Sequence, residues 1–273
     1  MGQCRSLIFL GETINVIDSH CHFDFDVFDG RREHILRQCV DLGIEGVVVP
    51  GVDPLQWDRA IKLNQTNGSD CRWWLAFGVH PWWLESLALE PTELIVKLDD
   101  CIARHGAIAI GECGLDGSID VPIERQQLFF EAQLQLACDR KLPLIIHAHR
   151  AHNDVLRLLA RYRPSAGGVI HGFSGSLELA RQYWRLGFYL GVGGTITYPR
   201  AKKTRTAFAQ LPLESLLLET DAPDMPLNGQ QGEPNSPTEL AKVADSLAQL
   251  RGISVESVKQ QTALNTRRLF LLN

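Results

Sequence analysis

Two histidines, His20 and His22, follow a short apolar run within residues 14–25, and their spacing is suited to metal binding. Side chains two positions apart on a β-strand point to the same face, so both imidazoles can reach one ion while Cys21 points away from it. The motif is short, and two hydrogen-bonded histidines at the end of a strand would have the same pattern. The metal-binding interpretation therefore depends on further ligands elsewhere in the chain.

Imidazole and carboxylate side chains also follow later apolar runs. Glu112 follows AIAIG, His147 follows LII, His171 follows GGVI, and Asp221 ends LLLETD. With the two histidines above, these six nitrogen and oxygen ligands suit a pair of divalent ions that share one carboxylate and leave positions open for water and substrate. Taken singly, Glu112 could cap a strand end and His171 could be a hydrogen-bonded core histidine. Their equivalent places in one repeating pattern favour the metal site.

That pattern alternates apolar runs with amphipathic segments. Successive runs end 22 to 35 residues apart, the length of one strand and one helix. Continuous apolar runs are typical of parallel strands covered on both faces, and residues 124–140 carry apolar side chains at helical spacing. The pattern predicts one α/β domain over residues 14–273, a (β/α)8 TIM barrel whose chemistry lies where the strands end. The eight predicted strand ends are near His20, Pro50, His80, Glu112, His147, His171, Gly193 and Asp221.

Composition and charge restrict the possible partners. The 273 residues are 45% hydrophobic, enough for a large core, and carry a formal charge of -5. Without an overall positive field, a polyanion would have to be bound locally, by metal or by a small basic patch. The seven cysteines are scattered and never spaced Cys-x-x-Cys, which indicates reduced thiols in the cytoplasm and argues against disulfides or a zinc–thiolate site. No obligate protein partner is evident.

Residues 1–13 are expected to form an N-terminal extension before the first strand. Their apolar segment, SLIFL, is too short for the core of a signal peptide or for a membrane span, so no membrane association is expected. Residues 1–6 also fit the N-myristoylation pattern, with Cys4 available for a second lipid. A plain extension is the simpler interpretation, and a mass measurement of the native protein would decide between the two.

A longer set of motifs resembles the TatD-type metal-dependent deoxyribonucleases. It comprises DSHCHFD at 18–24, GVHP at 78–81, GECGLD at 111–116, ERQQ from 124, LIIH at 144–147, VIHGFSG at 169–175 and ETDAPDMPLNG at 219–229. Within that family, TITYPR at 195–200 and the DMPLNG segment are similar to the YjjV-type branch. The match runs in motif order from about residue 16 to the C-terminus. The resemblance implies a metal-dependent hydrolase of phosphodiester bonds that acts on DNA ends, single-stranded or frayed.

The resemblance also implies a role for each ligand. His20, His22 and Asp221 would bind one ion, His147 and His171 the second, and Glu112 would bridge the two. Many related amidohydrolases use a modified lysine as the bridge, and AIAIGECG contains none, which favours the phosphodiesterase branch. Asp221 is our candidate general base, because it could deprotonate a water while remaining a ligand. Nitrogen and oxygen ligands of this kind can bind zinc, magnesium or manganese, so the sequence does not select one of these metals.

Four residues are predicted to bind substrate: His80, Arg150, Ser174 and Arg200. The family usually has an arginine two positions after the histidine of the fifth strand, where this chain has His149, so Arg150 is the candidate replacement. Arg200 begins a run of cations after the seventh strand, where barrels often bind phosphate. Two alternatives remain open: a hydrolase of small esters, lactones or amides on the same barrel, and a metal-containing binding scaffold without turnover.

Overall fold

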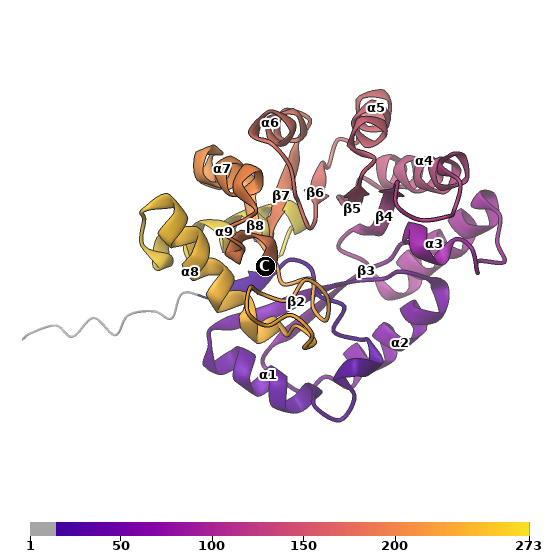
Figure 1. Ribbon diagram of the computed structural model, residues 1–273. Helices are drawn as coiled ribbons and strands as arrows, with labels where there is room; N and C mark the ends of the chain where they lie inside the picture. Colours follow the sequence, from indigo (N-terminus) through magenta and orange to yellow (C-terminus); the bar gives the residue numbers. More distant parts are fainter. Residues whose placement is uncertain (1–14, 273) are drawn as a thin grey trace, which may run out of the picture.

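The computed structural model describes residues 15–272, so the predicted extension over residues 1–13 and its lipidation pattern lie outside the described residues. Eight strands alternate with helices, and the helices α1 to α8 surround the strands in chain order (Figure 1). The strands are β1 (Val16–Asp18), β2 (Ile44–Pro50), β3 (Arg72–Ala76), β4 (Ile110–Asp116), β5 (Leu144–His149), β6 (Gly168–Ile170), β7 (Phe188–Val192) and β8 (Leu216–Leu218). The α-helices are α1 (Arg32–Asp41), α2 (Pro54–Gln65), α3 (Pro91–His105), α4 (Ile123–Arg140), α5 (His152–Tyr162), α6 (Leu177–Arg185), α7 (Lys202–Gln210), α8 (Leu240–Arg251) and α9 (Val255–Phe270).

All paired strands are parallel. The ladders run β1-β2-β3 and β4-β5-β6-β7-β8, and a bridge between Phe77 and Ile110 joins the two groups. The backbone N–H of Ser19 donates to the carbonyl of Leu218 at 2.9 Å, which links β1 to β8 and closes the ring. The predicted (β/α)8 barrel is confirmed.

Side chains along the strands alternate between two apolar layers. Leu216 and Leu218 pack under the surrounding helices. Leu217 belongs instead to a smaller cluster inside the barrel, to which each strand, or the residue just before it, contributes one side chain. Ile145 and Val169 are in the same inner cluster. Because the side-chain period of a strand is two residues, the positions two further along also face inward. That places polar side chains at the carboxyl ends of β5 and β6 inside the barrel mouth.

Local sequence signals set where the surrounding helices begin. The Asp53 carboxylate accepts from the backbone N–H groups of Leu55 and Gln56 at 2.7 and 2.9 Å, and Pro54 occupies the first position of α2. The buried residues of α3 lie at a spacing of four, which turns one stripe of the helix toward the barrel. No helix in residues 15–272 combines the length and the apolarity that a membrane crossing requires.

Helix α9 is attached to the barrel by a buried side chain. The Asn265 amide donates to the carbonyls of Leu213 and Leu216 at 2.9 and 2.8 Å, next to and within β8. Asn265→Ala is expected to lower the free energy of unfolding by about 1–3 kcal/mol, because both carbonyls would lose the amide donor and the Leu213 carbonyl would keep only the backbone N–H of Leu216. Urea denaturation measures this. Asn153→Ala is the matched control, since Asn153 is exposed. Equal stability of the two variants would contradict the prediction.

Candidate metal centre

A cavity of about 390 Å³ lies at the carboxyl ends of the strands. Five of the six predicted ligand residues line it, and the sixth, His20, is fully buried directly beneath and reaches the same carboxylates. The sequence separates these residues by up to 201 positions, and the barrel brings them together. The five lining ligand residues are His22, Glu112, His147, His171 and Asp221.

Four ligand atoms surround one point near β1 and β8. His20 Nε2 lies 3.3 Å from His22 Nε2, 3.2 Å from Glu112 Oε2 and 3.3 Å from Asp221 Oδ1. His22 Nε2 lies 3.3 Å from the same Glu112 oxygen and 3.7 Å from the same Asp221 oxygen. Each imidazole nitrogen carries at most one hydrogen, so it cannot donate to all of these neighbours at once. Converging lone pairs of this kind fit a cation.

The second oxygen of Glu112 faces a separate group of imidazoles. Glu112 Oε1 lies 2.7 Å from His171 Nε2, 3.4 Å from His147 Nδ1 and 3.3 Å from His80 Nε2. His147 Nδ1 and His171 Nε2 are 3.3 Å apart. A carboxylate that presents one oxygen to each of two ligand groups has the geometry of a bridge between two ions. His80, predicted from the sequence only as a substrate contact, lies at ligand distance in this group.

Ring packing orients the imidazoles. The ring of His20 stacks on that of His171 with centroids 3.9 Å apart, and the ring of His22 stacks on Phe25 at 4.8 Å. Gly111 lets the backbone that carries Glu112 lie directly against β5, since its φ is +150° and a Cβ there would lie 2.6 Å from the carbonyl oxygen of Ile145. The ligand atoms are therefore held in place by the apolar frame as well as by one another.

Burial and the neighbouring charged groups together set the charge of the centre. Burial acts to raise the pKa of the Glu112 carboxyl, but the neighbouring imidazoles, His171 foremost, outweigh it and hold that pKa well below its usual range. Burial lowers the pKa of His20 well below its ordinary value, which keeps the ring neutral, and raises the pKa of Asp221 to about 7. A cation would favour the ionised carboxylate and the neutral imidazole, the two forms that bind metals. The donor set thus fits divalent ions.

Asp116, which the sequence interpretation did not single out, supports the second ligand group. Its buried carboxylate accepts from His147 Nε2 at 3.0 Å, on the opposite side of the ring from Glu112. Such an outer carboxylate fixes the tautomer and orientation of a ligand histidine. A signal for it exists in the sequence, because Asp116 follows Glu112 by four residues on one strand and so shares its face.

Glu219, two residues before Asp221, supports the loop after β6. Its carboxylate accepts from the backbone N–H of Gly172 at 2.5 Å, and burial raises its pKa to about 8. Gly191 leaves the space for it, since a Cβ there would overlap the Glu219 carboxylate. Glu219 therefore holds the segment that follows His171 rather than entering the ligand groups.

The predicted substrate residues divide into two groups. Ser174 lines the cavity and shares a hydrogen bond of 3.3 Å with Thr204, and His80 and His149 also line it. Arg150 and Arg200 are exposed and are not among the described residues that line the cavity. The guanidinium of Arg200 instead lies over the ring of Tyr198, 5.1 Å from its centroid. Substrate binding by Arg150 and Arg200 stays a prediction.

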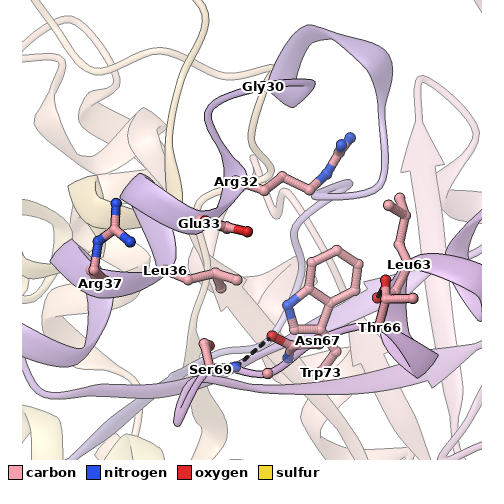
Figure 2. Close-up of a pocket in the computed structure, with 11 residues that line it drawn as sticks. Gly30, Arg32, Glu33, Leu36, Arg37, Leu63, Thr66, Asn67, Ser69 and Trp73 are labelled. Carbon is pink, nitrogen blue, oxygen red and sulfur yellow. Dashed lines mark hydrogen bonds between the residues drawn. The ribbon is translucent and has the colours of Figure 1, made fainter.

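A second cavity, of about 750 Å³, lies between α1 and the segment that joins α2 to β3, and it shares no lining residue with the first (Figure 2). Arg32 crosses its edge and donates to the carbonyls of Phe23 and Asp24, each at 2.9 Å. Because these carbonyls directly follow His22, Arg32 fixes the backbone that carries one ligand.

Comparison with known proteins agrees with this geometry. A family model described as TatD related DNase matches residues 17–271. An uncharacterized metal-dependent hydrolase, YjjV of Escherichia coli K12, is 43% identical over 257 residues, 93% of this chain and 97% of that protein. An uncharacterized metal-dependent hydrolase of Haemophilus influenzae is 40% identical over 94% of this chain and all of that protein. The 3'-5' ssDNA/RNA exonuclease TatD of Erwinia amylovora is 31% identical over 88% of this chain and 93% of that protein.

Solved structures have the same fold. The crystal structure of Escherichia coli YjjV gives a TM-score of 0.89 at 41% identity, covering 96% of this chain and all of that chain. A TatD family hydrolase of Entamoeba histolytica gives 0.82 at 19% identity, covering 95% and 99%, and this likeness shows the fold alone. With a family model that spans nearly all of its described residues and a ligand set built into the barrel mouth, this chain belongs to the TatD related DNase family of metal-dependent hydrolases.

Proposed function

We propose that this chain hydrolyses phosphodiester bonds at the ends of DNA strands, single-stranded or frayed, with two divalent ions. The observation that carries the proposal is the position of the Glu112 carboxylate between the two ligand groups. One oxygen lies 3.2 Å from His20 Nε2 and the other lies 2.7 Å from His171 Nε2. Relatives described as 3'-5' ssDNA/RNA exonucleases support the choice of substrate.

The two groups of ligand atoms support a role for each residue. His20, His22 and Asp221 would hold one ion, and His147 and His171 would hold the second, with Glu112 as the bridge. His80 accepts from the backbone N–H of Trp82 through Nδ1, so its Nε2 carries the hydrogen that points to Glu112 and is not free to bind an ion. Two ions bound there would offset the negative charge of the phosphodiester, lower the pKa of a water molecule and stabilise the leaving alkoxide. Zinc, magnesium and manganese all suit this nitrogen and oxygen set.

Asp221 is proposed as the general base. Its backbone N–H donates to the carbonyl of His20 at 2.9 Å, which fixes the residue beside the ligand group. Its side chain is 11% exposed, compared with 2% for Glu112, so it borders the open part of the cavity where water and substrate enter. It would orient the attacking water and accept its proton. Ser174, at the cavity wall, would donate a hydrogen bond to the phosphate.

A cleavage assay tests the proposal. The purified protein is expected to contain about two divalent ions per chain and to shorten single-stranded oligonucleotides labelled at either end. EDTA should abolish the cleavage, and separate addition of zinc, magnesium or manganese should restore it with at least one of them. The labelled end that is shortened gives the polarity.

Two other outcomes would count against the proposal. Hydrolysis of small esters, lactones or amides, with no action on oligonucleotides, would identify the alternative hydrolase. Binding of oligonucleotides without cleavage in the presence of each metal would identify a scaffold without turnover.

A further inference from the structure

Trp82, in the short 3-10 helix η2 (Pro81–Trp83), combines exposure with a fixed position. Its side chain is 58% exposed at the cavity, whereas Trp57 and Trp73 in the core are 2% and 7% exposed. Its indole Nε1–H donates to Asp116 Oδ2 at 2.8 Å, and its backbone N–H donates to His80 Nδ1 at 3.1 Å. The polar atom of the ring is therefore satisfied, and the ring offers the cavity an apolar face that does not need to move.

Asp116 joins this tryptophan to the metal centre. The carboxylate oxygen that accepts from Trp82 also accepts from His147 Nε2, at 3.0 Å. The other oxygen accepts from the backbone N–H and the hydroxyl of Ser118, at 2.8 and 2.6 Å. The backbone of Asp116 is held in turn by Gln126, through bonds of 2.8 and 2.9 Å. One rigid carboxylate thus sets both a ligand ring and the exposed indole.

The same wall of the cavity is aromatic. Phe25 and Trp83 line it with ring centroids 6.5 Å apart, and Trp83 lies edge-on to His80 at 5.5 Å. An exposed indole that is locked beside a phosphodiester-cleaving centre matches the way proteins hold single-stranded nucleic acids, where unpaired bases stack on aromatic rings. A buried tryptophan that only closed the fold would not leave more than half of its surface open.

We propose that Trp82 is the stacking platform for the unpaired base next to the cleaved phosphodiester, and that Asp116 positions Trp82 and His147 together. The inference rests on the proposed function and adds to it the side chain that would hold the terminal base of the strand. Asp116 is a positioning residue, because it acts through the indole and the imidazole.

Two matched substrates test the platform. One is a single-stranded oligonucleotide with a normal base beside its terminal phosphodiester, and the other carries an abasic tetrahydrofuran residue at that position. Wild-type kcat/KM should be roughly 5- to 150-fold lower on the abasic substrate, the range that stacking of one base is worth. Trp82→Leu should lower kcat/KM on the normal substrate to the same degree and leave the abasic one unchanged. Trp82→Phe, which keeps a ring, should fall between.

Asp116→Asn tests the positioning role. It should lower kcat on both substrates and weaken metal retention against a chelator, each by about 10- to 100-fold, as expected when the outer partner of a ligand histidine is lost. In the double variant with Trp82→Phe, the loss of kcat should be smaller than the product of the two single losses, since both substitutions disturb the same hydrogen bond between Trp82 and Asp116. Val96→Ala, an exposed apolar side chain on α3, is the control and should match wild type.

The outcomes distinguish a failure of the proposed nuclease activity from a failure of the stacking platform. If wild type cleaves neither substrate, the proposed function fails and this inference fails with it. If wild type cleaves but Trp82→Leu loses activity equally on both substrates, or loses none, the stacking platform is wrong while the nuclease stands. Thermal melts of the variants identify any loss caused by unfolding.

Discussion

Glu112→Gln is expected to abolish hydrolysis and to reduce the bound metal from about two ions per chain to one or none. The substitution keeps the shape of the side chain but replaces one anionic oxygen with an amide that cannot bridge. A bridged pair of ions contributes several kcal/mol of transition-state stabilisation, so kcat/KM should fall on the order of a thousandfold or more. Metal analysis and oligonucleotide cleavage are measured on the same preparation.

The control for this variant is Glu85→Gln, which makes the same chemical change at an exposed position. It should keep wild-type metal content and activity. A Glu112→Gln protein that is folded, retains two ions and cleaves at the wild-type rate would contradict the bridging role. Since Glu112 is 2% exposed, a thermal melt must accompany the assay to show that the fold is intact.

Asp221→Asn is expected to lower kcat by about 10²–10⁴-fold, the usual contribution of a general base, with a smaller change in KM. The asparagine retains an oxygen that can act as a ligand but cannot accept the proton of the attacking water. Metal content should therefore fall less than in Glu112→Gln. Single-turnover cleavage with saturating enzyme separates this chemical step from substrate binding.

Asp120→Asn, on the exposed loop that follows β4, is the matched control and should behave as wild type. A drop in metal content equal to that of Glu112→Gln, with activity fully restored by excess metal, would leave Asp221 as a ligand only. Asp221 and Glu112 would then both act only as metal ligands.

Periodicity alone predicted much of this molecule. Continuous apolar runs at a spacing of one strand and one helix specify a parallel barrel, because each run must be covered on both faces. Polar residues that follow such runs, as His147 follows LII and His171 follows GGVI, are expected at the strand ends and hence at the barrel mouth. The structure shows that they share the inner face with Ile145 and Val169. The ligand residues could be named for the same reason, together with the resemblance of their motifs to one family.

The contacts that depend on loops could not be read from the sequence. His80 reaches Glu112 because its backbone N–H is held by the carbonyl of Val52 at 3.0 Å, a contact across two loops. Arg150 has a φ of +50° and lies outside the cavity lining, while the neighbouring His149 faces it. The sequence by itself determined the barrel and which side chains gather at its mouth, because strand periodicity is local. Tertiary packing alone decided which atom of each side chain meets which partner, because those distances depend on segments far apart in the chain.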